Sequence, residues 1–197
     1  PALAKGIVTS RNELIARMDS DDISEKTRCE KQLLAFEKNT DLEMVGSFEA
    51  EFIGEKDNVV SIHRVPETHS DIAKFMRRRC AILHPTVMYK KGAVIRSGNY
   101  HSVPLYEDYD LFARMVLEYN VRSYNIQENL YYIRTSEDFF KRRGGLKYAK
   151  TVLNFKWKQH KKGYMSLADF CISGLGQAFV CVLPNSLRKV IYLKLLR

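Results

Sequence analysis

The chain has 197 residues, of which 45% are hydrophobic and 28% charged. That is enough for one domain with a packed core and argues against a disordered polymer or a fibrous repeat. Its four cysteines form no CxxC pair, so reduced thiols are expected rather than a zinc ribbon or a disulfide-stapled secreted fold. The net charge of +9 is unevenly placed, since residues 141–197 hold 13 Lys and Arg against one acid while residues 1–140 carry a net −3.

The first predicted elements are the end of a helix around Leu3 and Ile7 and a short apolar strand at 14–18. The strand is expected to be buried and to stop at the acidic turn Asp19-Ser20-Asp21-Asp22. Three carboxylates within four residues repel one another unless a cation or hydrogen-bond donors compensate them.

Carboxylate oxygens at a strand end suit Mg²⁺ or Mn²⁺, which proteins often hold with one or two carboxylates while a diphosphate completes the shell. A calcium EF-hand starting at Asp19 is rejected, because its fifth and sixth positions would be Ile23 and Ser24. The alternative is that Asp21 or Asp22 only caps the next helix. The spacing alone leaves both interpretations open.

That next helix is predicted to begin near Glu25, with the Ser24 hydroxyl as its cap. Cys29, Leu33 and Phe36 recur at helical spacing and form its predicted apolar face.

Two β-like runs, 44–53 and 59–65, flank a glycine-containing turn and predict a hairpin. A short helix capped by Thr68 or Ser70 follows. The next strand is predicted at 86–89, introduced by His84-Pro85, and a short helix leads from it to Gly98.

The segment 107–120 predicts an amphipathic helix, with Leu111 and Met115 on one face. Glu107 and Asp108 open it and form a second acidic site. Carboxylates at a helix N-terminus are stabilised by the unpaired N–H groups, so they need no other role. The functional alternative is that one of them faces a cleft as a general base.

Short strands are predicted at 121–126 and 130–133, and from 136 the chain becomes helical and basic. The alternation of strands and helices predicts an α/β fold with a mixed sheet. We therefore expect a body at 1–140 and a basic helical tail at 141–197.

Within the tail, the apolar stretch 166–183 carries only Asp169 as a charge and is bordered by Lys and Arg. This pattern favours contact with an anionic membrane surface, lying in the interface rather than crossing it. The alternative is an ordinary core helix with a solvated basic face. Nucleic-acid binding is not expected, because the basic residues border an apolar run.

The two acidic sites together resemble the family 2 glycosyltransferases with a GT-A fold, of the bacterial type that builds surface polysaccharides. The resemblance covers roughly residues 1–140 and rests on the following blocks, in this order: Leu14-Ile15-Ala16-Arg17-Met18-Asp19-Ser20-Asp21-Asp22-Ile23, His84-Pro85-Thr86-Val87-Met88, Gly98-Asn99-Tyr100, Glu107-Asp108-Tyr109-Asp110-Leu111 and Leu130-Tyr131-Tyr132-Ile133-Arg134.

By this resemblance, Asp19-Ser20-Asp21 is the DxD motif. Asp21 would bind Mn²⁺ or Mg²⁺, and Asp19 would contact the ribose, the nucleotide or the metal. Asp108 would be the catalytic base that removes a proton from the acceptor hydroxyl.

Three further residues have two interpretations each. Arg134 could lie near the donor diphosphate or form a structural salt bridge. His84 could line the acceptor or metal site, although a loop histidine satisfied by backbone is the stronger expectation. Glu107 would contact the acceptor or be structural, and Arg17 would offset the charge of the acidic turn.

The resemblance implies an inverting glycosyltransferase, of hexosyl or N-acetylhexosaminyl type, at the cytoplasmic face of a membrane. Its donor would be a nucleotide-sugar, UDP-linked, and its acceptor a lipid-linked or growing glycan. The chain begins with Pro1 rather than Met, and we expect a longer parent whose nucleotide-binding half lies upstream. The alternative is a non-catalytic, membrane-associating fragment of such an enzyme.

Overall fold

The computed structural model describes residues 2–135, 144–184, 187–188 and 191. The chain divides into two compact units. The first comprises Pro1–Met76 and Cys80–Arg134, and the second comprises Arg77–Arg79 and Thr135–Arg197.

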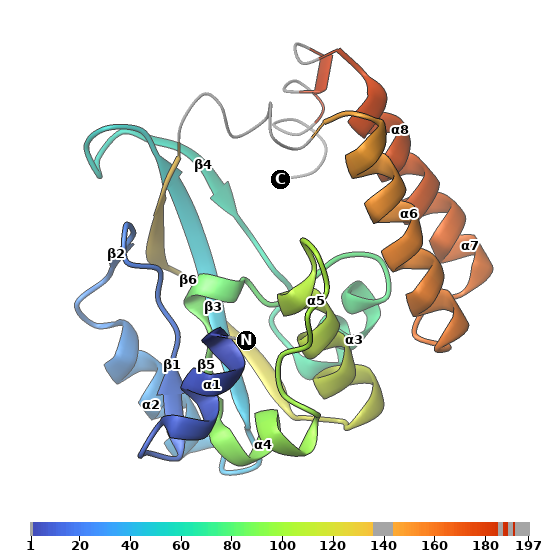
Figure 1. Ribbon diagram of the computed structural model, residues 1–197. Helices are drawn as coiled ribbons and strands as arrows, with labels where there is room; N and C mark the ends of the chain where they lie inside the picture. Colours follow the sequence, from blue (N-terminus) through green and yellow to red (C-terminus); the bar gives the residue numbers. More distant parts are fainter. Residues whose placement is uncertain (1, 136–143, 185–186, 189–190, 192–197) are drawn as a thin grey trace. The chain divides into compact units, whose positions relative to one another are not determined.

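The first unit is built on a six-stranded mixed sheet, as the sequence predicts (Figure 1). Its strand order is β1-β5-β3-β6-β2, and β4 pairs with β3 beside this path. The central pair β3 and β6 is parallel, and the other pairs are antiparallel. The strands are β1 (Leu14–Ala16), β2 (Ile23–Ser24), β3 (Met44–Phe52), β4 (Val59–His63), β5 (Met88–Lys90) and β6 (Ser123–Arg134).

Two strand predictions need correction. The runs 121–126 and 130–133 are parts of one strand, β6, whose pairing with β3 shifts register where the polar Gln127 and Glu128 interrupt the apolar pattern. The strand predicted at 14–18 is shorter and only half-buried, because β1 pairs with β5 alone.

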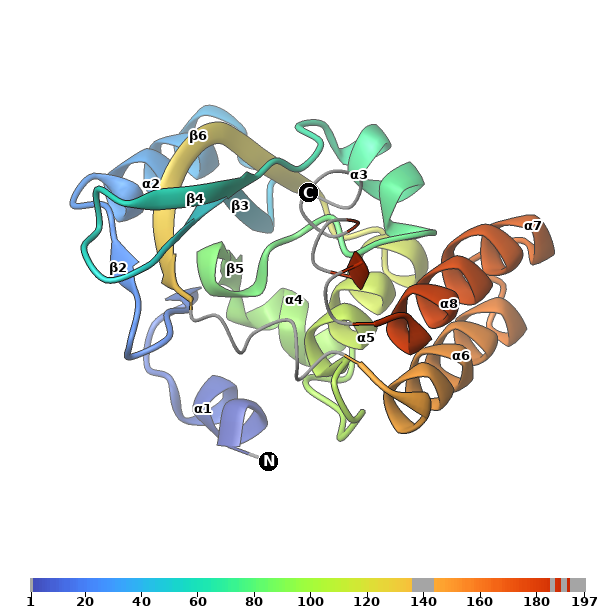
Figure 2. The same cartoon turned by 90° about the horizontal axis from the view of Figure 1, so that it is seen from above.

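Helix α2 lies on one face of the sheet, and α3 and α5 lie on the other (Figure 2). Helix α5 continues into the π-helical segment η2, so the predicted helix over 107–120 is present with a change of winding. The helical elements of this unit are α1 (Ala2–Thr9), α2 (Arg28–Lys38), α3 (His69–Met76), η1 (His84–Thr86), α4 (Lys91–Arg96), α5 (Glu107–Ala113) and η2 (Arg114–Glu118).

Helix α2 begins later than the sequence predicts. Ser24 does not cap it, because Ser24 pairs with Tyr131 in the sheet and the helix starts at Arg28. Its N-cap is Thr27, so neither Asp21 nor Asp22 caps this helix.

The buried face of α2 also differs from the predicted one. Arg28, Gln32 and Phe36 are buried, whereas Cys29 and Leu33 are exposed. Polar side chains can occupy the inner face of the helix because they donate hydrogen bonds to backbone carbonyls of the segments beneath it. The Gln32 amide donates to Val45 O at 3.0 Å and to Thr86 O at 2.8 Å, which satisfies a group that would be costly to bury unpaired.

The apolar core on this side of the sheet fixes the orientation of α2. Its buried members come from the helix, the loop after it and three strands, with Leu14, Ala35 and Tyr124 packed around them. They are Phe36, Leu42, Val45, Met88, Ile126 and Leu130.

The second unit contains α6 (Leu146–Lys161) and a helical run at 167–182, formed by α7 (Leu167–Asp169), η5 (Phe170–Leu175) and α8 (Gly176–Val182). The run begins at a capping box in which Ser166 and Asp169 satisfy each other's backbone N–H groups. Among the described residues, no helix is both long enough and apolar enough to cross a membrane.

Candidate functional site

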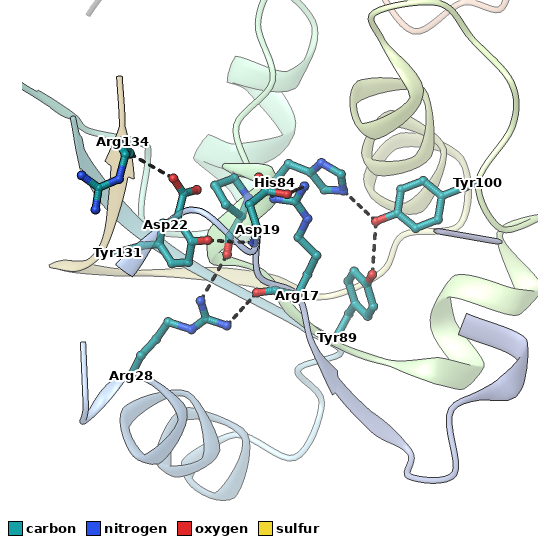
Figure 3. Close-up of polar contacts among 10 residues, drawn as sticks. Arg17, Asp19, Asp22, Arg28, His84, Tyr89, Tyr100, Tyr131 and Arg134 are labelled. Carbon is teal, nitrogen blue, oxygen red and sulfur yellow. Dashed lines mark hydrogen bonds and ion pairs between the residues drawn. The ribbon is translucent and has the colours of Figure 1, made fainter. Parts of the chain in front are cut away.

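The acidic turn follows β1 and is held against the end of β6 (Figure 3). The backbone N–H of Asp19 donates to the Tyr131 hydroxyl at 2.9 Å, and the N–H of Arg134 donates to Asp22 Oδ1 at 2.9 Å. The Asp22 carboxylate is therefore a structural anchor. Its pKa is raised, chiefly by burial, although the Arg134 and Tyr131 hydrogen bonds oppose the shift.

The other two carboxylates of the turn differ in their partners. Asp19 receives both of its hydrogen bonds from Arg17, at 2.8 Å and 2.5 Å, in a bidentate ion pair. Asp21 is exposed, and within the described part of the chain its carboxylate has no hydrogen bond or ion pair. Asp21 is thus available to a ligand, whereas Asp19 must first leave Arg17.

This donor set fits a divalent cation completed by substrate oxygens. Within the described ranges, no three His, Cys, Asp or Glu side chains gather as a metal-binding group, so a closed protein site is not formed. Mg²⁺ and similar hard cations often take only one or two protein carboxylates and fill their shells with water and phosphate. Asp21 and Asp19 supply ligands of that kind.

A buried arginine that sequence reasoning missed donates hydrogen bonds to the backbone next to the acidic turn. Arg28 is 2% exposed and donates to Arg17 O at 2.7 Å and to Pro85 O at 3.2 Å, with its guanidinium over the Tyr131 ring. It joins the acidic turn to the start of η1. The signal that could have found it is the polar pair Arg28 and Gln32 at helical spacing with Phe36.

Arg134 forms no salt bridge within the described residues. Its guanidinium donates to Gly54 O at 2.8 Å and to Asp21 O at 3.4 Å, and it stacks over the Phe52 ring. Its charge therefore lies beside the acidic turn, on an exposed surface, without a carboxylate partner among these residues.

His84 is satisfied by a hydroxyl, so the expectation of a backbone partner is wrong. Its Nε2 lies 3.0 Å from the Tyr100 hydroxyl, which lies 3.1 Å from the Tyr89 hydroxyl (Figure 3). Burial, aided by the Arg17 charge, lowers the pKa of His84 to about 3. The imidazole is therefore neutral at physiological pH.

Asp108 lies in the first turn of α5, half-buried, and its Oδ1 accepts a hydrogen bond from the Tyr109 N–H at 2.7 Å. Burial raises its pKa most, and the Glu107 charge adds to this, while the Arg17 charge opposes it. A carboxylate whose pKa is moved towards neutrality is a better proton acceptor at working pH. Glu107 is exposed and makes no such contact among the described residues.

The third acid of this helix, Asp110, is structural. It is buried and accepts from Arg114 at 3.0 Å, while His101 Nδ1 lies 3.2 Å away. Arg114 in turn donates to Ser97 O and to Asn99 O. This pair holds the loop that carries Tyr100, a role that the sequence pattern did not reveal.

Arg17 is a charged neighbour of both acidic sites. Its guanidinium binds Asp19, and its charge acts on the pKa of His84, Tyr100 and Asp108. The charge of this one cation therefore reaches both Asp19 of the acidic turn and Asp108. Asp21 and Arg134 extend the cluster at the outer edge of the turn.

Two curated relatives match the whole chain. It is 36% identical to a UDP-Gal:alpha-D-GlcNAc-diphosphoundecaprenol beta-1,3-galactosyltransferase of Escherichia coli, spanning 70% of that protein. It is 32% identical to an uncharacterized glycosyltransferase of Haemophilus influenzae, spanning 72%. A third relative, the amylovoran biosynthesis glycosyltransferase AmsE of Erwinia amylovora, is 31% identical over 76% of this chain and 55% of its own length.

Solved structures agree on the fold. The mannosyltransferase PcManGT from Pyrobaculum calidifontis, in complex with GDP-Man and Mn²⁺, has a TM-score of 0.52 at 12% identity, covering 96% of this chain and 57% of that one. The protein TarS of S. aureus, residues 1–349, has a TM-score of 0.50 at 16% identity, covering 77% and 44%. No protein-family model matches the chain. From the two whole-chain relatives and this shared fold, the chain belongs to the GT-A glycosyltransferases of bacterial surface-polysaccharide synthesis.

Proposed function

We propose that this chain carries the metal and acceptor side of an inverting glycosyltransferase that uses a nucleotide-sugar, UDP-linked, as its donor. The observation that carries the proposal is that Arg17, which pairs with Asp19, is also close enough to Asp108 to lower its pKa. A donor diphosphate at the turn and an acceptor hydroxyl at Asp108 would meet there. The whole-chain relative that transfers Gal from UDP-Gal supports the choice of nucleotide.

In this mechanism Asp108 accepts the proton of the acceptor hydroxyl. The hydroxyl oxygen forms a bond to the anomeric carbon of the donor sugar while the bond from that carbon to the diphosphate oxygen breaks, and the electron pair leaves with the nucleoside diphosphate. Attack opposite the leaving group inverts the anomeric configuration, and no covalent sugar–enzyme intermediate forms. A positioned general base of this kind contributes about 10² to 10⁴-fold to the rate.

Asp21 and Asp19 would hold the divalent cation, Mn²⁺ or Mg²⁺, which when bound would supply positive charge to the departing diphosphate. The structural neighbour PcManGT, solved in complex with GDP-Man and Mn²⁺, supports the choice of a divalent metal. Arg134, with its charge beside Asp21, would add a permanent cation at the same edge. His84, neutral and bonded to Tyr100, would line the acceptor side without exchanging protons.

The acceptor would be a lipid-linked or growing glycan, because one whole-chain relative acts on a GlcNAc-diphosphoundecaprenol. The enzyme would therefore work at the cytoplasmic face of the membrane, with the basic segment 141–197 providing peripheral contact.

The test is sugar transfer from a UDP-sugar to a GlcNAc-diphospho-lipid acceptor in the presence of Mn²⁺, with the anomeric configuration of the product read by NMR. Asp108→Asn should lower the transfer rate at least about 100-fold, while the matched control Glu107→Gln should retain most of it. Equal loss in both variants, or a product with retained configuration, would contradict the proposed mechanism.

A further inference from the structure

One face of the helical run 167–182 exposes apolar side chains only. Phe179 and Ile172 are 63% and 60% exposed, and Leu175 and Val182 recur at intervals of three or four residues beside them. The other exposed positions on the run are also uncharged and apolar or small: Leu167, Ala168, Cys171 and Gly176. A surface helix facing water normally carries polar residues on that side.

The opposite face of the run already has its partner within the unit. Gly174, Ala178 and Cys181 are buried, and a Cβ placed on Gly174 would lie 3.1 Å from the Phe170 ring and 3.4 Å from Lys156 Cβ on α6. The run is therefore a packed helix with a second, outward apolar face. The alternative of an ordinary core helix does not account for this face.

The charge around the run is almost wholly positive. Segment 141–197 has 13 Lys and Arg and one acid, Asp169, and this acid is paired with Arg78 at 2.5 Å, which lowers its pKa further. Among the residues described on α6 and just after it, Lys147, Lys150, Lys158, Lys161 and Lys162 are exposed. An anionic surface would meet these cations without repulsion from an unpaired carboxylate of this part of the chain.

An exposed tryptophan of α6 packs against the beginning of the run. Trp157 is 42% exposed, its ring packs against Phe170 with 5.3 Å between centroids, and Lys161 lies over it. Trp with neighbouring Lys is the combination that settles at the level of lipid headgroups, where the ring is half in apolar surroundings.

The length of the run determines how it could meet a bilayer. Sixteen residues span about 24 Å at 1.5 Å per residue, whereas the hydrocarbon core is about 30 Å thick. A helix of this length with one apolar face lies in the plane of the interface.

We propose that the run 167–182 is a membrane-docking surface. Ile172, Leu175, Phe179 and Val182 enter the headgroup region of an anionic bilayer, and the lysines of α6 bind its phosphates. This inference rests on the proposed function, because a lipid-linked acceptor is the reason for the enzyme to dock on a membrane. Two copies meeting through this face are disfavoured, since each would bring the same excess of positive charge.

The experiment is co-sedimentation of the purified full chain with vesicles of phosphatidylcholine alone or with one third phosphatidylglycerol, at low and high salt. The double variant Ile172→Gln/Phe179→Gln should lower the partition coefficient on anionic vesicles at least about tenfold, since two apolar side chains that the bilayer would bury are lost. Lys158→Gln/Lys161→Gln should remove most of the preference for the anionic lipid. Val60→Thr/Ile62→Thr, on exposed apolar positions of β4, is the matched control and should bind normally.

Circular dichroism, together with the conservative Phe179→Leu variant, which should still bind vesicles, separates loss of docking from loss of folding. Vesicle binding unchanged in Ile172→Gln/Phe179→Gln would overturn the inference. So would a wild-type dimer that this variant converts to monomers while neither protein binds vesicles. Transfer to a water-soluble acceptor is independent of docking, so its loss or retention tests the proposed glycosyltransferase separately.

Discussion

At the scale of single residues, Arg17 determines whether the Asp19 carboxylate is available to a ligand. Its guanidinium occupies both carboxylate oxygens of Asp19, and its side chain is 14% exposed against 44% for that of Asp19. The ion pair compensates the repulsion within the acidic turn without a metal. A divalent cation bound at Asp19, as proposed above, would therefore compete with Arg17 for the same oxygens.

The first prediction concerns that competition. Arg17→Met should tighten Mn²⁺ binding roughly three- to tenfold, because Asp19 is released and a nearby unit charge, partly screened by water, is removed. Titration of Mn²⁺ followed by electron paramagnetic resonance measures this without any activity. Arg96→Met, which removes the remote ion pair with Glu43, is the control, and weaker Mn²⁺ binding in Arg17→Met than in this control would refute the competition.

The second prediction is a trade between stability and activity at Asp108. Its pKa is higher in the folded state than its ordinary value, so the folded protein binds the proton more tightly than the unfolded chain. Stability therefore falls as pH rises from the ordinary Asp value through the raised one. Asp108→Asn should raise the melting temperature at pH 7 while lowering the transfer rate at least about 100-fold.

The gain in melting temperature should shrink on acidification below the ordinary pKa of Asp, where the wild-type carboxyl is neutral in both states. Glu107→Gln, on the exposed neighbour, should show no comparable gain. A lower melting temperature for Asp108→Asn at pH 7 would mean that the ionised carboxylate stabilises the fold, contrary to this account.

The third prediction follows from the neutral His84. Its pKa is about 3 in the folded state and near 6.5 when unfolded, so the unfolded chain takes up the proton first. The resulting stability is complete above pH 6.5 and is lost as pH falls towards 3. His84→Gln can still bond to Tyr100 but cannot titrate. Its acid-unfolding midpoint, followed by circular dichroism, should therefore lie at lower pH than that of the wild type, once the two proteins' stabilities at neutral pH are taken into account. An unchanged midpoint would contradict the prediction.

At the scale of elements, the start of α5 and the loop before it behave as one assembly. Asp110 and Arg114 are 4% and 5% exposed, and Arg114 bonds to two carbonyls of the loop. That loop contains Asn99 with a left-handed φ of 57° and Tyr100 beside it, whose N–H bonds to the Asn99 side chain. The buried ion pair thus positions the Tyr100 hydroxyl against His84.

The fourth prediction tests this assembly. Arg114→Met removes the buried guanidinium that binds Asp110 and should lower the free energy of unfolding by about 3 kcal/mol. Urea unfolding measures this loss. The double variant Asp110→Asn/Arg114→Met should recover part of it, and a double variant less stable than Arg114→Met alone would contradict the assigned pairing.

Elements that depend on residues adjacent in the sequence could be predicted. The hairpin β3–β4 follows from two β-like runs around Gly54, which has a φ of 72°. The start of α2 could not be predicted, because Ser24 is taken by a pairing with Tyr131 more than a hundred residues away. The buried Arg28 and Gln32 were missed for the same reason, since their carbonyl partners come from elsewhere in the chain.

At the scale of the whole molecule, two properties of the sequence proved informative. The alternation of strands and helices predicted the α/β fold, which the structure confirms. The order of the motifs indicated the glycosyltransferase family, which the relatives confirm. Local patterns, acids at a strand end and at a helix start, drew attention to Asp19, Asp21 and Asp108, and the resemblance assigned their roles, which stay predictions. Arg17 as their common neighbour could not, because that proximity exists only once β1 and α5 are placed on one sheet.

The most direct test of the account is paramagnetic relaxation by Mn²⁺ bound to the purified chain, observed by NMR on the His84 and Tyr100 ring signals. We expect strong broadening of these signals, little effect on His69 and Tyr124 at the far end of the sheet, and loss of the broadening in Asp19→Asn/Asp21→Asn. Equal broadening of both pairs of signals, or broadening that survives in this variant, would show that the acidic turn and Asp108 do not share one metal-bearing site.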